Sequence, residues 1–229
     1  MSIIVKNITK YYDNHLVINN INFNVKKGEI LGLLGLNGAG KSTIMKMICS
    51  YVQPNSGEIF ICEKNIAKHP NGTKKKIGYL SENNPLYQDM YVSEFLSFIS
   101  NLYNLKKKNF KNVIELTGIK GIENKKIKFL SAGQKKRIGI AQAILHEPEV
   151  IILDEPTATL DPNQKNEIHQ LIKKLGSNKS ILFSTHLLEE AEKICDRIII
   201  LHNNIIIANK KRTDFKDNLN EIFKKLTNQ

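Results

Sequence analysis

Short apolar runs alternate with amphipathic segments along most of this chain. Residues 2–9 and 16–25 alternate between apolar and polar positions and are rich in β-branched side chains, which predicts two early antiparallel strands. The runs 150–153, 180–183 and 197–201 are largely apolar, which is typical of parallel strands that are buried on both faces. Helical patterns separate these later runs, and strands that alternate with helices predict a doubly wound α/β core.

The segment from about residue 85 to residue 146 has a helical pattern instead. Residues 92–105 carry apolar side chains at helical spacing, with Ser93 as a plausible N-cap. A second helix is expected at about 109–117, with Gly118 at its C-terminal end, and a third near Gln134. We therefore expect one domain, with an α/β core at 1–84 and 147–229 and an inserted helical subdomain at 85–146.

Length and charge narrow the class of protein. The chain has 229 residues, enough for one large α/β domain and too few for two. No apolar run approaches the ~20 residues that a membrane-spanning helix needs, and the N-terminus lacks the features of a signal peptide. The net charge is +12, but the lysines are scattered and only three basic residues are arginines. This favours a solvated surface in a cytosolic protein, with no nucleic-acid partner expected.

The three cysteines are Cys49, Cys62 and Cys195. Their number is odd and their spacing does not suit a zinc site, so we expect reduced, mostly buried thiols.

The strongest chemical signal is a glycine-rich loop after the apolar run 30–34. It matches the phosphate-binding P-loop pattern, G-x-x-x-x-G-K-[ST], and is expected to lead into a helix from Thr43 to Tyr51. Its backbone N–H groups and the helix N-terminus would bind phosphate oxygens, Lys41 would contact the β- and γ-phosphates, and Ser42 would bind Mg²⁺. The alternative is an ordinary turn before a helix. The candidate binding residues are Gly35, Leu36, Asn37, Gly38, Ala39, Gly40, Lys41, Ser42 and Thr43.

Two carboxylates follow the apolar strand 150–153. Ligands of open α/β sheets bind beyond the carboxyl ends of the strands, where the P-loop also lies. Asp154 would hold Mg²⁺, and Glu155 would accept a proton from an attacking water or orient it. The alternative is a pair of acids in an exposed loop.

Four further motifs appear in a fixed order and cover nearly the whole chain with the P-loop. They are Leu130-Ser131-Ala132-Gly133-Gln134, Leu153-Asp154-Glu155-Pro156-Thr157, Leu160-Asp161-Pro162 and Ser184-Thr185-His186. Together they resemble the ATP-binding subunit of ABC transporters, with Ala132 where the L-S-G-G-Q signature usually has glycine. The resemblance implies a P-loop NTPase core with a mostly parallel sheet, an N-terminal antiparallel β-subdomain and the inserted helical subdomain.

The resemblance also implies a dimer that encloses two ATP molecules. Each ATP would lie between the P-loop of one copy and Ser131, Gly133 and Gln134 of the other. His186 resembles the switch histidine that contacts the γ-phosphate, and Asp161 the aspartate that links the two copies; alternatively, Asp161 caps a helix. The remaining histidines are expected to be structural.

Two positions match the family less closely. Tyr12 lies where an aromatic side chain stacks on adenine, although Tyr11 is adjacent and a buried strand-end tyrosine is the alternative. Glu82 lies where most members have glutamine; it can still bind Mg²⁺ or water but lacks the amide donors.

The expected function is ATP hydrolysis with Mg²⁺, held by Ser42, Asp154 and Glu82, with Lys41, Glu155 and His186 as catalytic residues. The protein would act on the cytoplasmic face of the inner membrane and drive multi-span membrane subunits on separate chains, with a second ATP-binding subunit that is identical or homologous. The segment after Glu82 resembles ABC-2-type exporters, including the gliding-motility ATPases, which favours export. Apolar residues near Leu86, Tyr87, Met90 and Tyr91 are candidates for the membrane-subunit contact, and the alternative is ordinary packing under the helices. The alternative is a soluble ABC ATPase that moves no substrate, such as an assembly factor.

Overall fold

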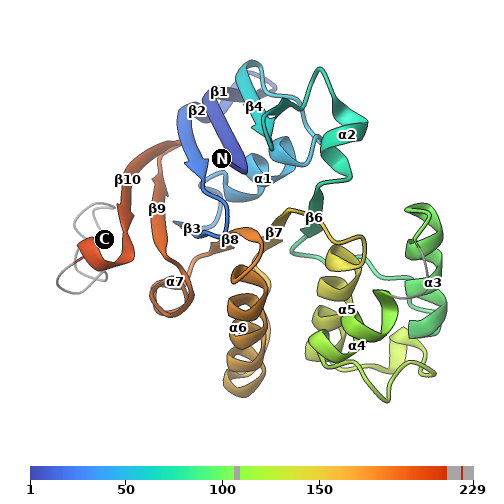
Figure 1. Cartoon of the computed structure of the whole chain (residues 1–229). Coiled ribbons are helices and arrows are strands. Elements are labelled where there is room, and N and C mark those ends of the chain that lie inside the picture. The colour runs from blue at the N-terminus through green and yellow to red at the C-terminus, as the bar shows by residue number, and fades with distance from the viewer. Residues whose placement is uncertain (106–108, 216–222, 224–229) are drawn as a thin grey trace.

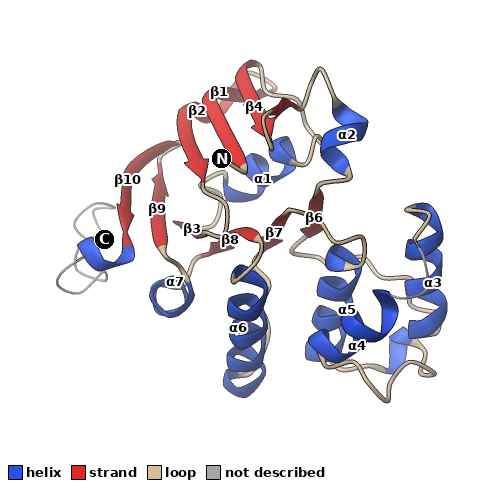
Figure 2. Ribbon diagram, in the orientation of Figure 1, coloured by secondary structure: helices blue, strands red, loops and turns tan. Residues whose placement is uncertain are grey.

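A computed structural model describes residues 1–105, 109–215 and 223, which form two sheets and a set of helices (Figure 1). The antiparallel sheet has the strand order β2-β1-β4-β5 and lies at one end of the molecule (Figure 2). Its strands are β1 (Ile3–Tyr12), β2 (His15–Val25), β4 (Ser56–Ile61) and β5 (Lys64–Asn65). The early antiparallel strands were thus correctly predicted.

The second sheet has the order β10-β9-β3-β8-β7-β6 and is parallel except for the edge pair β10 and β9. Its strands are β3 (Ile30–Gly35), β6 (Ile77–Leu80), β7 (Val150–Asp154), β8 (Ser180–Thr185), β9 (Arg197–His202) and β10 (Ile205–Lys211). The α-helices are α1 (Lys41–Ile48), α2 (Pro70–Lys74), α3 (Val92–Leu102), α4 (Asn109–Thr117), α5 (Ala132–Ile144), α6 (Pro162–Gly176) and α7 (Leu188–Ile194). Two 3₁₀ turns occupy Ile127–Phe129 and Arg212–Asp214.

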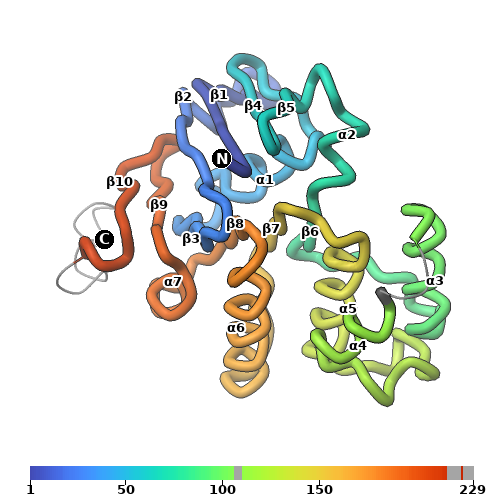
Figure 3. Tube along the Cα trace, in the orientation of Figure 1, coloured from blue at the N-terminus to red at the C-terminus, as the bar shows by residue number. Residues whose placement is uncertain are grey.

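Alternation along the parallel strands supplies two hydrophobic cores, one on each face of the larger sheet. Leu31 and Leu33 of β3 point into the core shared with α1 and the antiparallel sheet. Ile30 and Leu34 point into the core shared with the helices of the opposite face. Because successive side chains of a strand point to opposite faces, a wholly apolar strand can fill both cores at once. Helix α1 accordingly lies between the two sheets (Figure 3).

The strand order brings distant parts of the sequence together. β3, β8 and β7 are neighbours in register, with Leu34 opposite Thr185 and Asp154 opposite Ser184. Their carboxyl ends therefore meet at one edge of the sheet, where ligands of open α/β sheets bind.

The helices α3, α4 and α5 form a group beside this sheet (Figure 1). Helix α3 starts after Tyr91, whose N–H donates to the Glu94 carboxylate at 2.9 Å. The prediction of Ser93 as its N-cap is therefore wrong, because Glu94 reaches back across the first turn. Helix α5 packs closely on β6, since a Cβ at Gly78 would lie 2.0 Å from the Ala143 carbonyl oxygen.

The sequence also led to predictions about the three cysteines and about membrane-spanning helices. Cys49 and Cys195 are buried and Cys62 is half-buried, and all three are free, as predicted. Burial raises the pKa of each thiol, that of Cys62 to about 11. No helix among the residues that the structure describes has the length and hydropathy needed to span a bilayer. Of the C-terminal tail, only Phe223 is described beyond residue 215.

Arg197 forms a half-buried ion pair with Glu29 and also hydrogen-bonds to the antiparallel sheet. Arg197 at the start of β9 donates to Glu29 at 2.7 and 3.0 Å and to the Asn24 carbonyl oxygen at 2.6 Å. Burial by itself would raise the pKa of Glu29, but the hydrogen bonds and charge of Arg197 lower it overall. The stabilisation from this pair is thus present above about pH 4.5 and is lost as the pH falls through the lowered pKa.

Arg197→Met is expected to lower the free energy of unfolding by about 2 kcal/mol, because the half-buried Glu29 carboxylate loses its charged hydrogen-bond partner. Urea denaturation at pH 7 measures this change. Lys128→Met is the matched control, because its ion pair with Asp89 at 2.8 Å is exposed and contributes less than about 1 kcal/mol. Equal effects of the two substitutions would contradict a structural role for the pair of Arg197 and Glu29.

Candidate nucleotide-binding and catalytic site

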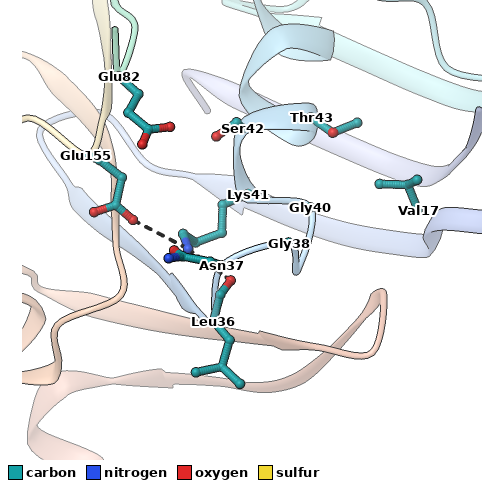
Figure 4. A pocket seen from close by; sticks show the side chains of 10 residues that line it. All are labelled: Val17, Leu36, Asn37, Gly38, Gly40, Lys41, Ser42, Thr43, Glu82 and Glu155. Atoms are coloured by element: carbon teal, nitrogen blue, oxygen red, sulfur yellow. Dashed lines mark hydrogen bonds and ion pairs between the residues drawn. The ribbon is translucent and has the colours of Figure 1, made fainter. Parts of the chain in front are cut away.

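A cavity of about 290 Å³ opens at the carboxyl ends of the parallel strands (Figure 4). Helix α1 begins at Lys41, two residues before the predicted start, because Gly40 adopts a φ of 98° and directs the chain straight into the helix. A Cβ at Gly40 would lie 2.5 Å from Ile18 Cδ1, so only glycine fits here without displacement. The cavity is lined by Val17, Leu36, Asn37, Gly38, Gly40, Lys41, Ser42, Thr43, Glu82 and Glu155.

The Lys41 ammonium is buried at the base of this cavity. It donates to the carbonyl oxygens of Gly35 at 2.7 Å and Leu36 at 3.2 Å, and it lies 3.4 Å from the Glu155 carboxylate (Figure 4). Its own loop and one carboxylate thus hold the Lys41 side chain in the cavity, where the P-loop pattern puts phosphate oxygens.

Glu155, which follows β7, contacts His186 after β8 and Lys41 at the start of α1. Its Oε2 lies 3.0 Å from His186 Nδ1, so the residues after β7 and β8 meet. Its backbone has a φ of 47°, the left-handed region that is costly for a side chain of this kind, and its N–H donates to Ser184 Oγ at 2.9 Å. Ser184 Oγ–H in turn donates to Asp154 Oδ1 at 2.7 Å. Neither acid lies in an exposed loop, since Asp154 is 1% exposed and Glu155 6%.

Glu82 lies on the same side of the cavity as Glu155, with its carboxylate facing Ser42 (Figure 4). Its backbone carbonyl oxygen accepts a hydrogen bond at 2.7 Å from Lys136, a buried lysine of α5. Burial lowers the pKa of Lys136, while the charges of Glu82, Asp154 and Glu155 oppose that shift. The sequence analysis did not single out Lys136.

The signature residues lie outside this cavity. Ser131 caps α5: its Oγ accepts from the Gln134 N–H at 3.2 Å, and the Gln134 side chain accepts from the Ser131 N–H at 3.0 Å. Gly133 packs against α6, where a Cβ would lie 2.8 Å from Gln164 Oε1. Ala132 is exposed, so its methyl group displaces nothing in this chain.

Several other predicted residues are also absent from the cavity lining, namely Tyr12, Gly35, Ala39, Asp154, Asp161 and His186. Asp161 caps α6 by accepting from the Gln164 N–H at 2.9 Å. Tyr12 is 42% exposed at the β1–β2 turn, with the Lys10 ammonium 5.2 Å from its ring centroid. The alternative of a buried strand-end tyrosine is therefore wrong.

Comparison with known proteins places the chain in a family. The sequence profile described as "ABC transporter" matches residues 18–158. The linearmycin resistance ATP-binding protein LnrL of Bacillus subtilis (strain 168) is 38% identical, over 91% of this chain and 69% of the relative. The Nod factor export ATP-binding protein I of Burkholderia orbicola (strain AU 1054) is 34% identical, over 89% and 68%.

Comparison with solved structures leads to the same family. The ATP-binding subunit of an ABC transporter superposes with a TM-score of 0.89 at 29% identity, covering 99% of each chain. The dimeric post-hydrolysis state of the ATP-binding cassette MJ0796, bound to ADP and Pi, superposes with a TM-score of 0.83 at 27% identity, covering 92% of this chain and 98% of that one. This chain therefore belongs to the ABC transporter family, as an ATP-binding subunit that hydrolyses ATP.

Proposed function

We propose that this chain hydrolyses Mg-ATP in a two-fold dimer and that the resulting motion drives export through membrane subunits on separate chains. The observation that carries the proposal is the meeting of the P-loop, Glu155 and His186 in one site. In that site Lys41 binds the β- and γ-phosphates, Glu155 accepts the proton of the attacking water, and His186 orients the water and contacts the γ-phosphate.

The acidic end of the sheet fits a magnesium ion. Asp154 is 1% exposed, and within residues 1–105 and 109–215 no ion pair neutralises its carboxylate. Ser42 and Glu82 line the cavity, as does Glu155, which directly follows Asp154. No group of three or more His, Cys, Asp or Glu side chains in the described part of the chain is arranged to hold a metal alone. Mg²⁺ suits such a site because it retains waters and binds phosphate oxygens, and bound there it would neutralise charge on the transferring group.

The dimer is supported by the position of Ser131. This side chain is exposed and is not part of the cavity of its own chain. Contact between the signature and a γ-phosphate therefore requires the nucleotide of another copy, which also accounts for Gly133 and Gln134 as binding residues in trans. Asp161, at the exposed N-terminus of α6, would link the two copies.

Ser131→Glu tests the dimer. We expect hydrolysis to fall at least about tenfold, because a carboxylate would be brought against the γ-phosphate of the other copy. The dissociation constant of nucleotide for the isolated chain should stay unchanged, because Ser131 is remote from its own cavity. The control is Ser177→Glu, at the exposed end of α6. A weakened dissociation constant in the Ser131 variant would contradict the arrangement in trans.

The membrane partner would bind near the group of helices 85–146. Tyr87 is 57% exposed and Tyr91 40% exposed, which leaves both available for contact, and Met90 is half-buried. Leu86 is buried, so its prediction as a contact residue is wrong. The names of the relatives for linearmycin resistance and Nod factor export support export as the direction, on the cytoplasmic face of the membrane.

Co-purification tests transport against a soluble assembly role. The tagged chain, expressed in its native host, should elute with a multi-span membrane protein in detergent, and its ATPase activity should then depend on the complex. A chain with full activity that never associates with a membrane protein would favour the assembly factor instead.

Tyr12 stays a prediction for adenine stacking, which Tyr12→Ala would test through nucleotide affinity, with Tyr11→Ala as the control.

A further inference from the structure

One carboxylate outside the cavity accepts hydrogen bonds from both catalytic loops. Glu190 of α7 is 4% exposed. Its oxygens accept from Thr157 Oγ1 at 2.8 and 2.9 Å and from Thr185 Oγ1 at 2.8 Å. Both threonines are buried as well, so these hydrogen bonds are shielded from competing water.

The two threonines flank the residues that act in hydrolysis. Thr157 lies two positions after Glu155, and Thr185 lies immediately before His186. The Leu187 N–H also donates to Thr185 Oγ1 at 3.0 Å, so the backbone on both sides of His186 is fixed through one hydroxyl. Glu155 and His186 themselves meet at 3.0 Å.

We propose that Glu190 is a positioning residue that sets the separation of Glu155 and His186. It contacts neither side chain directly and does not line the cavity. It acts by holding Thr157 and Thr185 to the same carboxylate, which places the two loops relative to each other. This inference rests on the catalytic roles of Glu155 and His186 under the proposed function.

The surroundings of Glu190 suit a hydrogen-bond acceptor. Two hydroxyl donors need acceptors, and the two oxygens of one carboxylate can serve both. Lys165 Nζ of α6 lies 3.5 Å from Oε1 and supplies compensating charge. His169 Nε2 lies 3.8 Å from the same oxygen, but burial lowers the pKa of this histidine, so Lys165 is the cation of the pair. Helix α6 is thereby joined to the same centre as the β7 and β8 loops.

The consequence for catalysis is geometric. Reactive groups need to be held close to their productive positions, and a displacement of about 1 Å can cost about 100-fold in rate. Without Glu190, both threonine hydroxyls lose their buried acceptor, and the loops that carry Glu155 and His186 are free to separate. The rate of hydrolysis should fall, whereas binding of nucleotide by the P-loop should not.

The test compares Glu190→Ala with Glu190→Gln, and uses Glu189→Ala, an exposed glutamate of the same helix, as the matched control. We expect kcat to fall at least about tenfold in Glu190→Ala with a nucleotide dissociation constant within about twofold of the starting protein. Glu190→Gln, which keeps an acceptor oxygen for one hydroxyl, should recover much of the lost rate, and Glu189→Ala should change neither quantity.

A double-mutant cycle separates positioning from simple loss of stability. Thr185→Val alone should lower kcat, but in the Glu190→Ala background it should cause little further loss, because the shared contact is already gone. If Glu190→Ala does not fold, the single variants Thr157→Val and Thr185→Val carry the test, each with a lower kcat at unchanged nucleotide affinity.

Two outcomes would overturn the inference. One is a kcat within about twofold of the starting protein in well-folded Glu190→Ala, or in both threonine variants. The other is a strictly additive effect of Thr185→Val and Glu190→Ala. Neither outcome bears on the proposed function, which fails instead if Glu155→Gln hydrolyses ATP at the normal rate.

Discussion

Glu155→Gln is expected to lower kcat for ATP hydrolysis by a factor of about 10² to 10⁴, the usual contribution of a positioned proton acceptor. The amide that replaces the carboxylate has nearly the same shape but cannot take a proton from water. The change also removes the negative charge 3.4 Å from the Lys41 ammonium, which leaves that cation free to bind phosphate. Nucleotide affinity should therefore be kept, and the variant should accumulate as an ATP-bound dimer.

Steady-state hydrolysis and size-exclusion chromatography with Mg-ATP measure the two effects. Glu149→Gln is the matched control, because this carboxylate precedes the same strand β7 but is exposed and pairs with Lys76. The control should hydrolyse ATP normally and show no trapped dimer. Near-normal turnover by Glu155→Gln would rule out Glu155 as the proton acceptor.

Lys41→Ala is expected to weaken nucleotide binding by about 10- to 150-fold. This range corresponds to the loss of one charge-assisted hydrogen bond, worth about 1.5–3 kcal/mol. The side chain is 6% exposed and lines the cavity. Hydrolysis should fall further than binding, because the same charge stabilises the phosphoryl group as it transfers.

Titration with a non-hydrolysable ATP analogue measures the affinity. Lys46→Ala is the matched control, since Lys46 lies on the same helix α1 but is exposed and is not part of the cavity lining. The control should bind the analogue as the starting protein does. Equal affinities for the Lys41 and Lys46 variants would remove the P-loop lysine from the site.

The sequence was most informative where a local rule decides the structure. The C-terminal end of α4 at Thr117 was predicted to the residue, because Gly118 ends the helix. The carboxyl-end rule also placed the P-loop and Glu155 at one edge of the sheet, since parallel strands share that edge whatever their order. The start of α1 was missed because nothing in the letters reveals the left-handed backbone of Gly40.

Contacts between distant residues could not be predicted in this way. Ser184, Lys136 and Glu190 contribute to the site through partners 29, 54 and 33 positions away. The one available signal for Ser184 is its place in the Ser184-Thr185-His186 run, and that motif predicts a role for the histidine only. Lys136 and Glu190 each read as one more charged residue on a helix, and only burial distinguishes them.

The left-handed backbone of Glu155 decides how inactive variants should be interpreted. Glycine and asparagine adopt this conformation readily, whereas branched residues such as valine or threonine resist it. A branched replacement would strain the chain between Asp154 and Thr157 as well as delete the carboxylate, so its inactivity would mix two causes. Screens of random substitutions at this codon should therefore recover folded protein most often with small or amide-bearing side chains.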